Sequence, residues 1–275
     1  FHSSISRGKF FQTDSFAIKN LNFSPLQHEQ FRAKHQQDPK LLDEAIAMLA
    51  KIHNMKIPIR KRKNILFDNI QEMTEVAYKN LPIRKDCEEA KYENLLSRDL
   101  SEEWKIVQRI MKKVNAPSVL CHCDFRGSNI LVTDQGLLCV DLEYSMYGAR
   151  AYDLSTMLNE WDKTELFDGS MGKVPNKEII MNVINIYISH CERLNPGYAS
   201  KPQNQPDVIY KEVRVYFPLI YIFFLSLMVK TEESIIPNMP FDRKQFLGFC
   251  DQCYGFYRST KADLLKDGFI DPEDL

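Results

Sequence analysis

The chain has 275 residues and a mass of 32.2 kDa, and 44% of its residues are hydrophobic, so it can bury the core of one large domain or two small ones. Its 36 Lys and Arg against 37 Asp and Glu give a formal net charge of -1, which provides no general positive field for nucleic acid or an anionic membrane surface. Seven cysteines, an odd number, do not indicate a disulfide framework and favour a reducing compartment such as the cytoplasm.

Two segments bear on targeting and membrane insertion. Residues 1–19 contain no apolar stretch of the length that a signal peptide needs. Residues 213–229 are almost wholly apolar, but Arg214 and Pro218 interrupt them, and the run 219–229 is too short to cross roughly 30 Å of hydrocarbon. We therefore expect a buried core helix there and no membrane span.

The first predicted helix follows a polar, irregular stretch over residues 1–38. Asp38 is a good N-cap, Pro39 suits the first helical position, and apolar residues then recur at helical spacing as far as Ile52. This pattern predicts a helix that begins at residue 39 and ends before Pro58. The basic run that follows is interpreted as a solvated loop, with phosphate or partner contact as the alternative.

The remaining elements are mostly helical around a small β element. Apolar β-type runs occur at residues 119–121, 130–132 and 137–140, and the turn residues Thr133–Gly136 predict that the last two form a hairpin. Helices are predicted at about residues 68–80, 101–114, 151–161, 177–193, 207–230 and 241–264. The fold class expected is α+β, mainly α.

The segment from His122 to Asn129 carries the strongest chemical signal, because it matches H-x-D-x-x-x-x-N, the spacing of a kinase catalytic loop. Phosphoryl transfer needs a carboxylate that accepts the proton of the attacking hydroxyl, a role that suits Asp124. His122 is interpreted as a hydrogen-bonding support. The alternative is that Asp124 and Asn129 are ordinary turn-capping residues before a hairpin and match the motif by chance.

The same reaction needs oxygen ligands that hold Mg²⁺ on the nucleotide phosphates. Asn129 stands at the start of the hairpin, and Asp141 and Glu143 follow its second strand, so the two arms bring these ligands together. A zinc site built from Cys121-x-Cys123 and Cys250-x-x-Cys253 is the competing metal hypothesis, but these cysteines lie in apolar segments and are interpreted as buried thiols.

Several stretches resemble the choline/ethanolamine kinases, relatives of the aminoglycoside phosphotransferases within the protein-kinase-like fold. The similarity lies in residues 46–67, in residues 121–132, and in Val140-Asp141-Leu142-Glu143-Tyr144-Ser145 and its continuation through residue 161. It implies ATP and Mg²⁺ as cofactors and phosphorylation of choline or ethanolamine in phospholipid precursor synthesis. It is also compatible with a homodimer. Asp153 would support the catalytic loop.

The resemblance also implies a division of the chain. Neither a Gly-rich loop over the phosphates nor a strand Lys paired with a helix Glu is identifiable. Residues 39–275 are therefore expected to form the C-terminal lobe of the kinase-like fold, with residues 1–38 as a hinge or remainder of an incomplete or absent N-terminal nucleotide lobe.

An acceptor pocket for the amino-alcohol follows from the same resemblance, because a quaternary ammonium is held by aromatic faces and a nearby carboxylate. The residues implied are Tyr144, Glu160, Tyr221, Phe224 and Phe249. Tyr221 and Phe224 stand where the family usually has tryptophans, and both also suit a helical core. Alternatives are a pseudoenzyme or binding protein without nucleotide binding, and a kinase for aminoglycosides or sugars, which would need acidic clusters instead.

Overall fold

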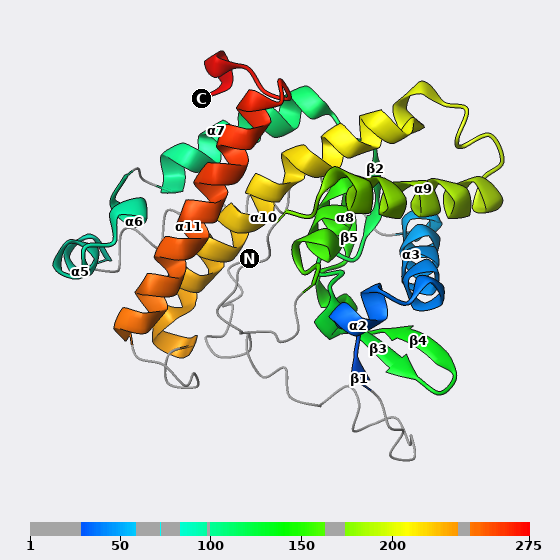
Figure 1. Cartoon of the computed structure of the whole chain (residues 1–275), viewed down its shortest axis with the longest axis horizontal. Coiled ribbons are helices and arrows are strands. Elements are labelled where there is room, and N and C mark those ends of the chain that lie inside the picture. The colour runs from blue at the N-terminus through cyan, green and yellow to red at the C-terminus, as the bar shows by residue number, and fades with distance from the viewer. Residues whose placement is uncertain (1–28, 59–71, 73–82, 98–99, 163–173, 236–242) are drawn as a thin grey trace.

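The computed structural model describes residues 29–58, 72, 83–97, 100–162, 174–235 and 243–275 (Figure 1). Most of these residues are helical, which confirms the expected α+β, mainly α, fold class. The α-helices are α2 (Ala33–Gln36), α3 (Pro39–Asn54), α5 (Ile83–Ala90), α6 (Glu93–Ser97), α7 (Leu100–Val114), α8 (Arg150–Asn159), α9 (Lys177–Leu194), α10 (Pro206–Ile235) and α11 (Arg243–Lys266). The strands are β1 (Glu29–Gln30), β2 (Ser118–Cys121), β3 (Ile130–Thr133), β4 (Gly136–Cys139) and β5 (Met146–Ala149).

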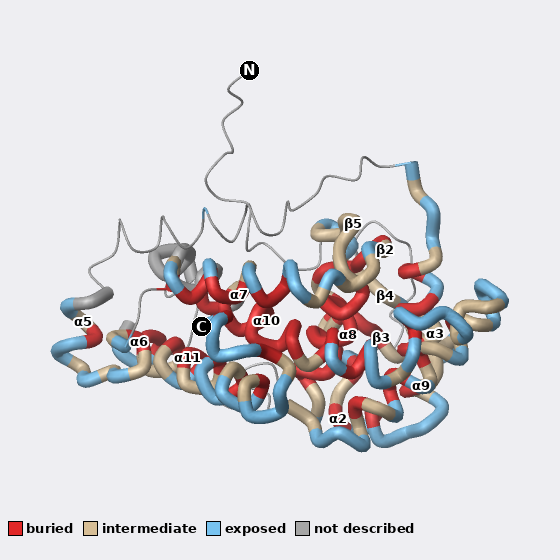
Figure 2. The backbone as a smooth tube through the Cα atoms, turned by 90° about the horizontal axis from the view of Figure 1, so that it is seen from above, coloured by how far each residue is buried: buried red, intermediate tan, exposed pale blue. Residues whose placement is uncertain are grey.

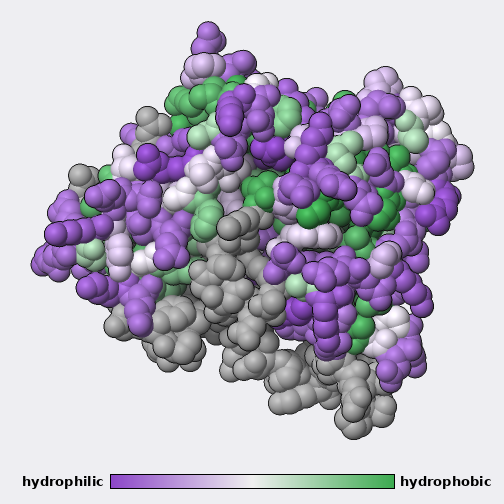
Figure 3. Space-filling view, viewed as in Figure 1, coloured by the Kyte–Doolittle hydropathy of each residue, from purple (hydrophilic) through white to green (hydrophobic). Residues whose placement is uncertain are grey.

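Helix α10 is the centre of the molecule and contacts α7, α8, α9 and α11. Its residues from Val213 to Tyr221 are mostly buried, and Figure 2 shows α8 and α10 as the most continuously buried helices. The helix continues through Pro218. The expected core helix is thus confirmed, and within the described residues no helix is both long and apolar enough to cross a bilayer. The face seen in Figure 3 is largely hydrophilic, with hydrophobic residues in separate patches.

Helix α3 begins and ends where the sequence predicts. The Asp38 carboxylate accepts a hydrogen bond from the Lys40 amide at 2.9 Å, and Pro39 is the first helical residue. The apolar stripe of α3, with Ala45, Ile46 and Leu49 fully buried, lies against α9. This contact fixes the end of α3 that carries His53 near the interior.

Two small antiparallel sheets position the site. Strand β3 lies between β1 and β4, and the pairing of Thr133 with Gly136 closes the predicted hairpin. The second sheet pairs β2 with β5, and Cys121 lies opposite Met146. The sequence predicts that residues 29–38 are irregular, but they contain β1 and α2. These elements form because β1 pairs with β3 and the Phe31 side chain is buried.

Arg150, the first residue of α8, anchors this helix through a buried polar network. Its Nε and Nη2 donate to the two carboxylate oxygens of Glu212 on α10 at 2.8 and 2.9 Å. Its Nη1 donates to Tyr198 at 2.8 Å and to Asn204 at 2.6 Å. The start of α8, which carries Asp153 one turn later, is therefore held firmly against α10.

The other predicted helices at 101–114, 151–161, 177–193 and 241–264 are confirmed within a few residues as α7, α8, α9 and α11. The helix predicted at 68–80, most of the basic run and residues 1–28 lie outside the described residues. The seven cysteines form no disulfide bond with one another and none is exposed, as the interpretation of buried thiols requires.

Candidate active site

The segment from His122 to Asn129 connects β2 of one sheet to β3 of the other, and the residues after β4 return beside it. The backbone amide of Val140 donates to the Asn129 carbonyl at 3.0 Å, which ties the two ends of the hairpin together. The loop and the residues that follow β4 are therefore neighbours, as the sequence predicts for the two arms of a hairpin.

Asp153 holds the start of this loop. Its two carboxylate oxygens accept hydrogen bonds from the backbone amides of His122 at 2.7 Å and Cys123 at 2.8 Å. Cys123 has a φ of 67°, a left-handed conformation that is unfavourable for a residue with a side chain. The hydrogen bonds that Asp153 accepts stabilise this strained turn, after which Asp124 is only partly buried.

His122 links the loop to the residues after β4. Its Nδ1 accepts a hydrogen bond from the Asp124 amide at 3.2 Å, which assigns the ring proton to Nε2. Nε2 then donates to the Val140 carbonyl at 3.0 Å. Both ring nitrogens are engaged with the backbone, so the imidazole has no nitrogen left for proton transfer.

The Asp124 carboxylate is partly accessible, with 22% of the side chain exposed. Its Oδ2 accepts a hydrogen bond from Asn129 Nδ2 at 2.7 Å, and the same nitrogen donates to the Asp124 carbonyl at 2.9 Å. Its Oδ1 lies 3.0 Å from Arg126 Nε. Since the Asn129 amide nitrogen makes both bonds, Asn129 Oδ1 is the atom that remains for a cation.

Asp141 and Glu143 follow β4, in the segment that the hydrogen bond between Val140 and Asn129 joins to the catalytic loop. Asp141 is left-handed, with a φ of 66°, and Glu143 and Tyr144 belong to the short turn of 3₁₀-helix at Leu142–Tyr144. Burial, followed by the negative charges of Glu143, Asp124 and Asp141, raises the pKa of Tyr144 to about 12. The three carboxylates therefore influence the same phenol.

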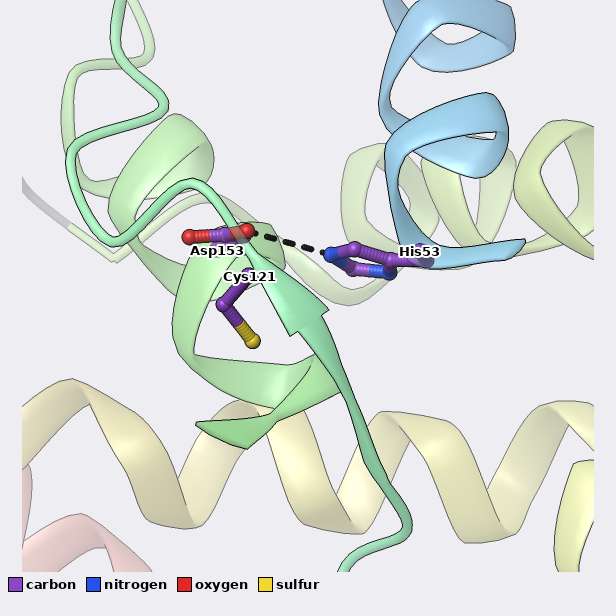
Figure 4. A group of neighbouring side chains, drawn as sticks. All are labelled: His53, Cys121 and Asp153. Atoms are coloured by element: carbon purple, nitrogen blue, oxygen red, sulfur yellow. Dashed lines mark hydrogen bonds and ion pairs between the residues drawn. The ribbon is translucent and has the colours of Figure 1, made fainter. Parts of the chain in front are cut away.

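The structure contains one tight group of three potential metal ligands among the described residues, and it is His53, Cys121 and Asp153 (Figure 4). His53 Nε2 bonds with Asp153 Oδ2 at 3.1 Å, and its Nδ1 bonds with Tyr187 at 2.8 Å. The pKa of the Cys121 thiol is raised well above its usual value by a hydrogen bond with Cys123 and by burial. Asp153 accepts hydrogen bonds from His53 and from two backbone amides of the loop, so this group provides hydrogen-bonded support for the loop.

Glu160 ends α8 and contacts the loop. Its Oε2 accepts a hydrogen bond from the Gly127 amide at 3.1 Å, and its carbonyl accepts one from Gln36 at 3.2 Å. A Cβ on Gly127 would lie 2.1 Å from the Phe31 carbonyl oxygen, so only glycine allows this close approach. Glu160 thus joins the loop to the α2 segment.

The aromatic residues of the predicted acceptor pocket lie in different environments. Tyr144 is half-buried beside the carboxylates, whereas Tyr221 is 1% exposed and stacks on Phe256 at 6.5 Å between ring centres. Phe249 is half-buried on α11, and the side chain of Phe224 lies outside the described set. Tyr221 therefore has the environment of a core residue in this structure.

Three contributors to the site have no clear signal in the sequence. Arg126 lies between Asp124 and Glu160, although its spacing from either indicates no partner. Gly127 is restricted by Phe31, and His53 reaches Asp153 across 100 residues of chain. Long-range partners of this kind follow from the fold and not from local pattern.

Comparisons with known proteins point to one family. A family model described as choline/ethanolamine kinase matches residues 24–244. Choline kinase alpha of Mus musculus is 22% identical over 231 residues, 78% of this chain, and the chain spans only about half (51%) of that relative. An ethanolamine kinase from Plasmodium vivax superposes with a TM-score of 0.63 at 19% identity, covering 86% of this chain and 66% of that one. The choline kinase LicA of Streptococcus pneumoniae, in complex with AMP, gives 0.56 at 15% identity, covering 85% and 67%.

Proposed function

Because the chain belongs to the choline/ethanolamine kinase family, we propose that the protein transfers a phosphoryl group from ATP to the hydroxyl of a small amino-alcohol, choline or ethanolamine. The observation that carries the proposal is the Asp124 carboxylate, which is partly exposed and oriented by Asn129 in a loop fixed by Asp153. A phosphoryl acceptor needs one oriented carboxylate within reach of its hydroxyl, and this loop provides it.

The residues of the loop have separate roles in the proposed reaction. Asp124 accepts the proton of the acceptor hydroxyl while the new bond from that oxygen to the γ-phosphorus forms and the bond from phosphorus to the bridging oxygen of ADP breaks. His122 keeps the loop closed on Val140, and Asp153 holds the amides that place Asp124. Most of the catalytic effect then comes from positioning.

Magnesium fits the side chains that surround Asp124. Asn129, Asp141 and Glu143 offer only oxygen ligands, which a hard cation such as Mg²⁺ prefers. Three carboxylates that together act on the Tyr144 phenol also provide the negative potential that a divalent ion neutralises. Bound there, Mg²⁺ would neutralise charge on the nucleotide phosphates.

The acceptor is proposed to enter on the side of Glu160 and Tyr144. Glu160 is a mostly buried carboxylate, and Tyr144 is a half-buried aromatic residue next to further acidic groups. A carboxylate and an aromatic face are the groups that recognise an ammonium ion. Tyr221, Phe224 and Phe249 complete the proposed set, with Tyr221 acting from behind the pocket because it is buried.

Location and assembly are also proposals. Seven cysteines, none of them exposed and none in a disulfide bond, support a reducing compartment and hence the cytoplasm. A homodimer is proposed from family membership. Analytical ultracentrifugation of the purified protein checks this, and a single species of monomer mass at micromolar concentration would contradict it.

The proposed activity is tested by steady-state phosphorylation of choline and of ethanolamine with Mg-ATP. We expect Asp124→Asn to lower kcat by about 10²- to 10⁴-fold, the usual contribution of a general base. Asp134→Asn is the matched control, because Asp134 is exposed in the turn of the same hairpin. Equal rates in the Asp124 variant and the unmodified protein would remove Asp124 from the reaction, and no transfer to either alcohol would reject the proposed function.

A further inference from the structure

Arg126 lies between two carboxylates of the candidate site. Its Nε is 3.0 Å from Asp124 Oδ1, and its Nη1 is 3.8 Å from Glu160 Oε1. Asn129 already occupies Asp124 Oδ2. Both oxygens of Asp124 therefore have a polar neighbour in this structure, and the guanidinium occupies space beside Oδ1 that a ligand between Asp124 and Glu160 would need.

The side chain of Arg126 can move away from Asp124 while the loop backbone stays in place. The side chain is 31% exposed, and its Nε, although close to Asp124, makes no aligned hydrogen bond among the described residues. The loop backbone is held independently, because the Arg126 carbonyl accepts from the Asn129 amide at 2.9 Å and the Gly127 amide donates to Glu160. Partly exposed ion pairs of this kind are weak and exchange readily.

Departure of the guanidinium has an electrostatic consequence. It leaves Asp124 and Glu160 without a shared cation, and the Glu160 side chain is only 10% exposed. Two carboxylates near each other in a poorly hydrated site repel, and without the guanidinium no positive charge offsets this repulsion. A ligand that carries its own positive charge restores the balance, whereas an uncharged alcohol does not.

We propose that Arg126 is a displaceable internal cation that competes with the ammonium group of the acceptor for the space between Asp124 and Glu160. The inference rests on the proposed function, since it concerns the acceptor site of that reaction. Arg126 thereby determines specificity in two ways. It excludes neutral alcohols, which cannot replace its charge, and it reduces the affinity for cationic ones, which must displace it.

The test is calorimetric titration of the protein, without nucleotide, with choline and with its uncharged isostere 3,3-dimethyl-1-butanol. We expect Arg126→Gln to bind choline about tenfold more tightly, because an internal competitor that occupies the site most of the time is removed. Binding of the neutral isostere should also rise in this variant, because the isostere no longer has to displace the guanidinium, but it should stay weaker than that of choline, since the isostere brings no charge to the two carboxylates. Arg193→Gln, which removes an exposed arginine on α9, is the matched control and should change neither.

A second measurement distinguishes occupancy of the acceptor site by the Arg126 guanidinium from a general change in the electrostatic potential of that site. Ethylguanidinium should compete with choline for the Arg126→Gln protein, because it replaces the missing group. In the unmodified protein, the side-chain ¹⁵Nε signal of Arg126 should shift along the choline binding curve. This readout does not depend on the folding of a variant.

Two results would overturn the inference. One is equal or weaker choline binding by Arg126→Gln with a native circular dichroism spectrum, and the other is a fixed Arg126 signal at choline saturation. Failure of the proposed function appears differently, as absence of phosphoryl transfer from Mg-ATP in a protein whose choline binding still responds to Arg126.

Discussion

Replacement of Gly127 by alanine tests the packing of the catalytic loop against the α2 segment. The added Cβ would lie 2.1 Å from the Phe31 carbonyl oxygen, whereas ordinary contact begins at 3.4 Å, so the two segments must separate by 1.3 Å, the difference between these distances. Phe31 cannot yield easily, because its ring is buried and its amide donates to the Ile130 carbonyl at 2.8 Å. The strain therefore falls on the loop and on its hydrogen bond to Glu160.

The free-energy cost of Gly127→Ala follows from these contacts. Overpacking costs about 1–3 kcal/mol, and loss of the hydrogen bond to a charged carboxylate about 1.5–3 kcal/mol. The lower entropy of the unfolded alanine chain offsets about 0.4–1 kcal/mol. The net loss in the free energy of unfolding is roughly 2–5 kcal/mol, which for a chain of this size lowers Tm by roughly 4–20 °C.

The assay is thermal unfolding followed by circular dichroism, with kcat measured at a temperature where both proteins are folded. Gly148→Ala is the matched control, because its Cβ would lie 3.4 Å from Cys121 Sγ, an ordinary contact. We expect kcat of Gly127→Ala to fall about 10²-fold, since a displacement of about 1 Å near the reacting groups is enough. A Tm within about 2 °C of the Gly148 control would refute this reasoning, because it lies below the smallest loss expected.

Three further variants test the supports of the site and the C-terminal turn. Arg150→Met leaves the Glu212 carboxylate buried without its partner and should lower the free energy of unfolding by about 3–5 kcal/mol in urea titrations; an unchanged midpoint would contradict this. Asp153→Asn places an amide opposite two backbone N–H groups and should reduce kcat at least about tenfold with little change in KM, measured by steady-state kinetics; a change in KM alone would argue against a positioning role. Burial alone would raise the pKa of Asp274, but hydrogen bonds from Lys113 and the Asp271 amide outweigh it and lower that pKa from 3.8. These contacts of the Asp274 carboxylate therefore contribute stability above pH 3.8, which is lost as the pH falls through the lowered pKa. The protection factors of the amides in the turn at residues 272–274, relative to the intrinsic exchange rate at each pH, should therefore fall only in acid in the native protein, and already at neutral pH in Lys113→Met. Equal protection factors in both proteins at neutral pH would contradict this.

Local sequence signals predict the elements well where one segment contains the whole pattern. Asp38-Pro39 and the apolar spacing up to Ile52 define α3, and the turn at Thr133–Gly136 defines the hairpin. The spacing from His122 to Asn129 also predicts that Asp124 and Asn129 meet, because five residues in one loop leave few alternatives. The geometry of these two residues is therefore largely local.

Other features depend on tertiary contacts that no local pattern contains. Strand β1 has only two residues and forms because β3 offers an unpaired edge. Tyr221 is assigned to an acceptor pocket by the family resemblance, with a core position as the alternative, and packing of α10 against α11 buries it. Glu160 is expected to face an acceptor, and in the structure it also contacts the Gly127 amide and lies near the Arg126 guanidinium, which no sequence pattern indicates. Sequence spacing defines which residues share a helix face, and not which neighbour covers that face.

The dependence of the loop on His53 has a practical consequence for dividing the gene into expressible fragments. A fragment that starts after α3 would keep Asp153 but lack His53, which it meets across 100 residues of chain. The carboxylate would then face the interior with one neighbour fewer, and the turn at Cys123 would lose part of its support. Split-reporter or complementation designs should therefore retain α3 and α8 on the same polypeptide.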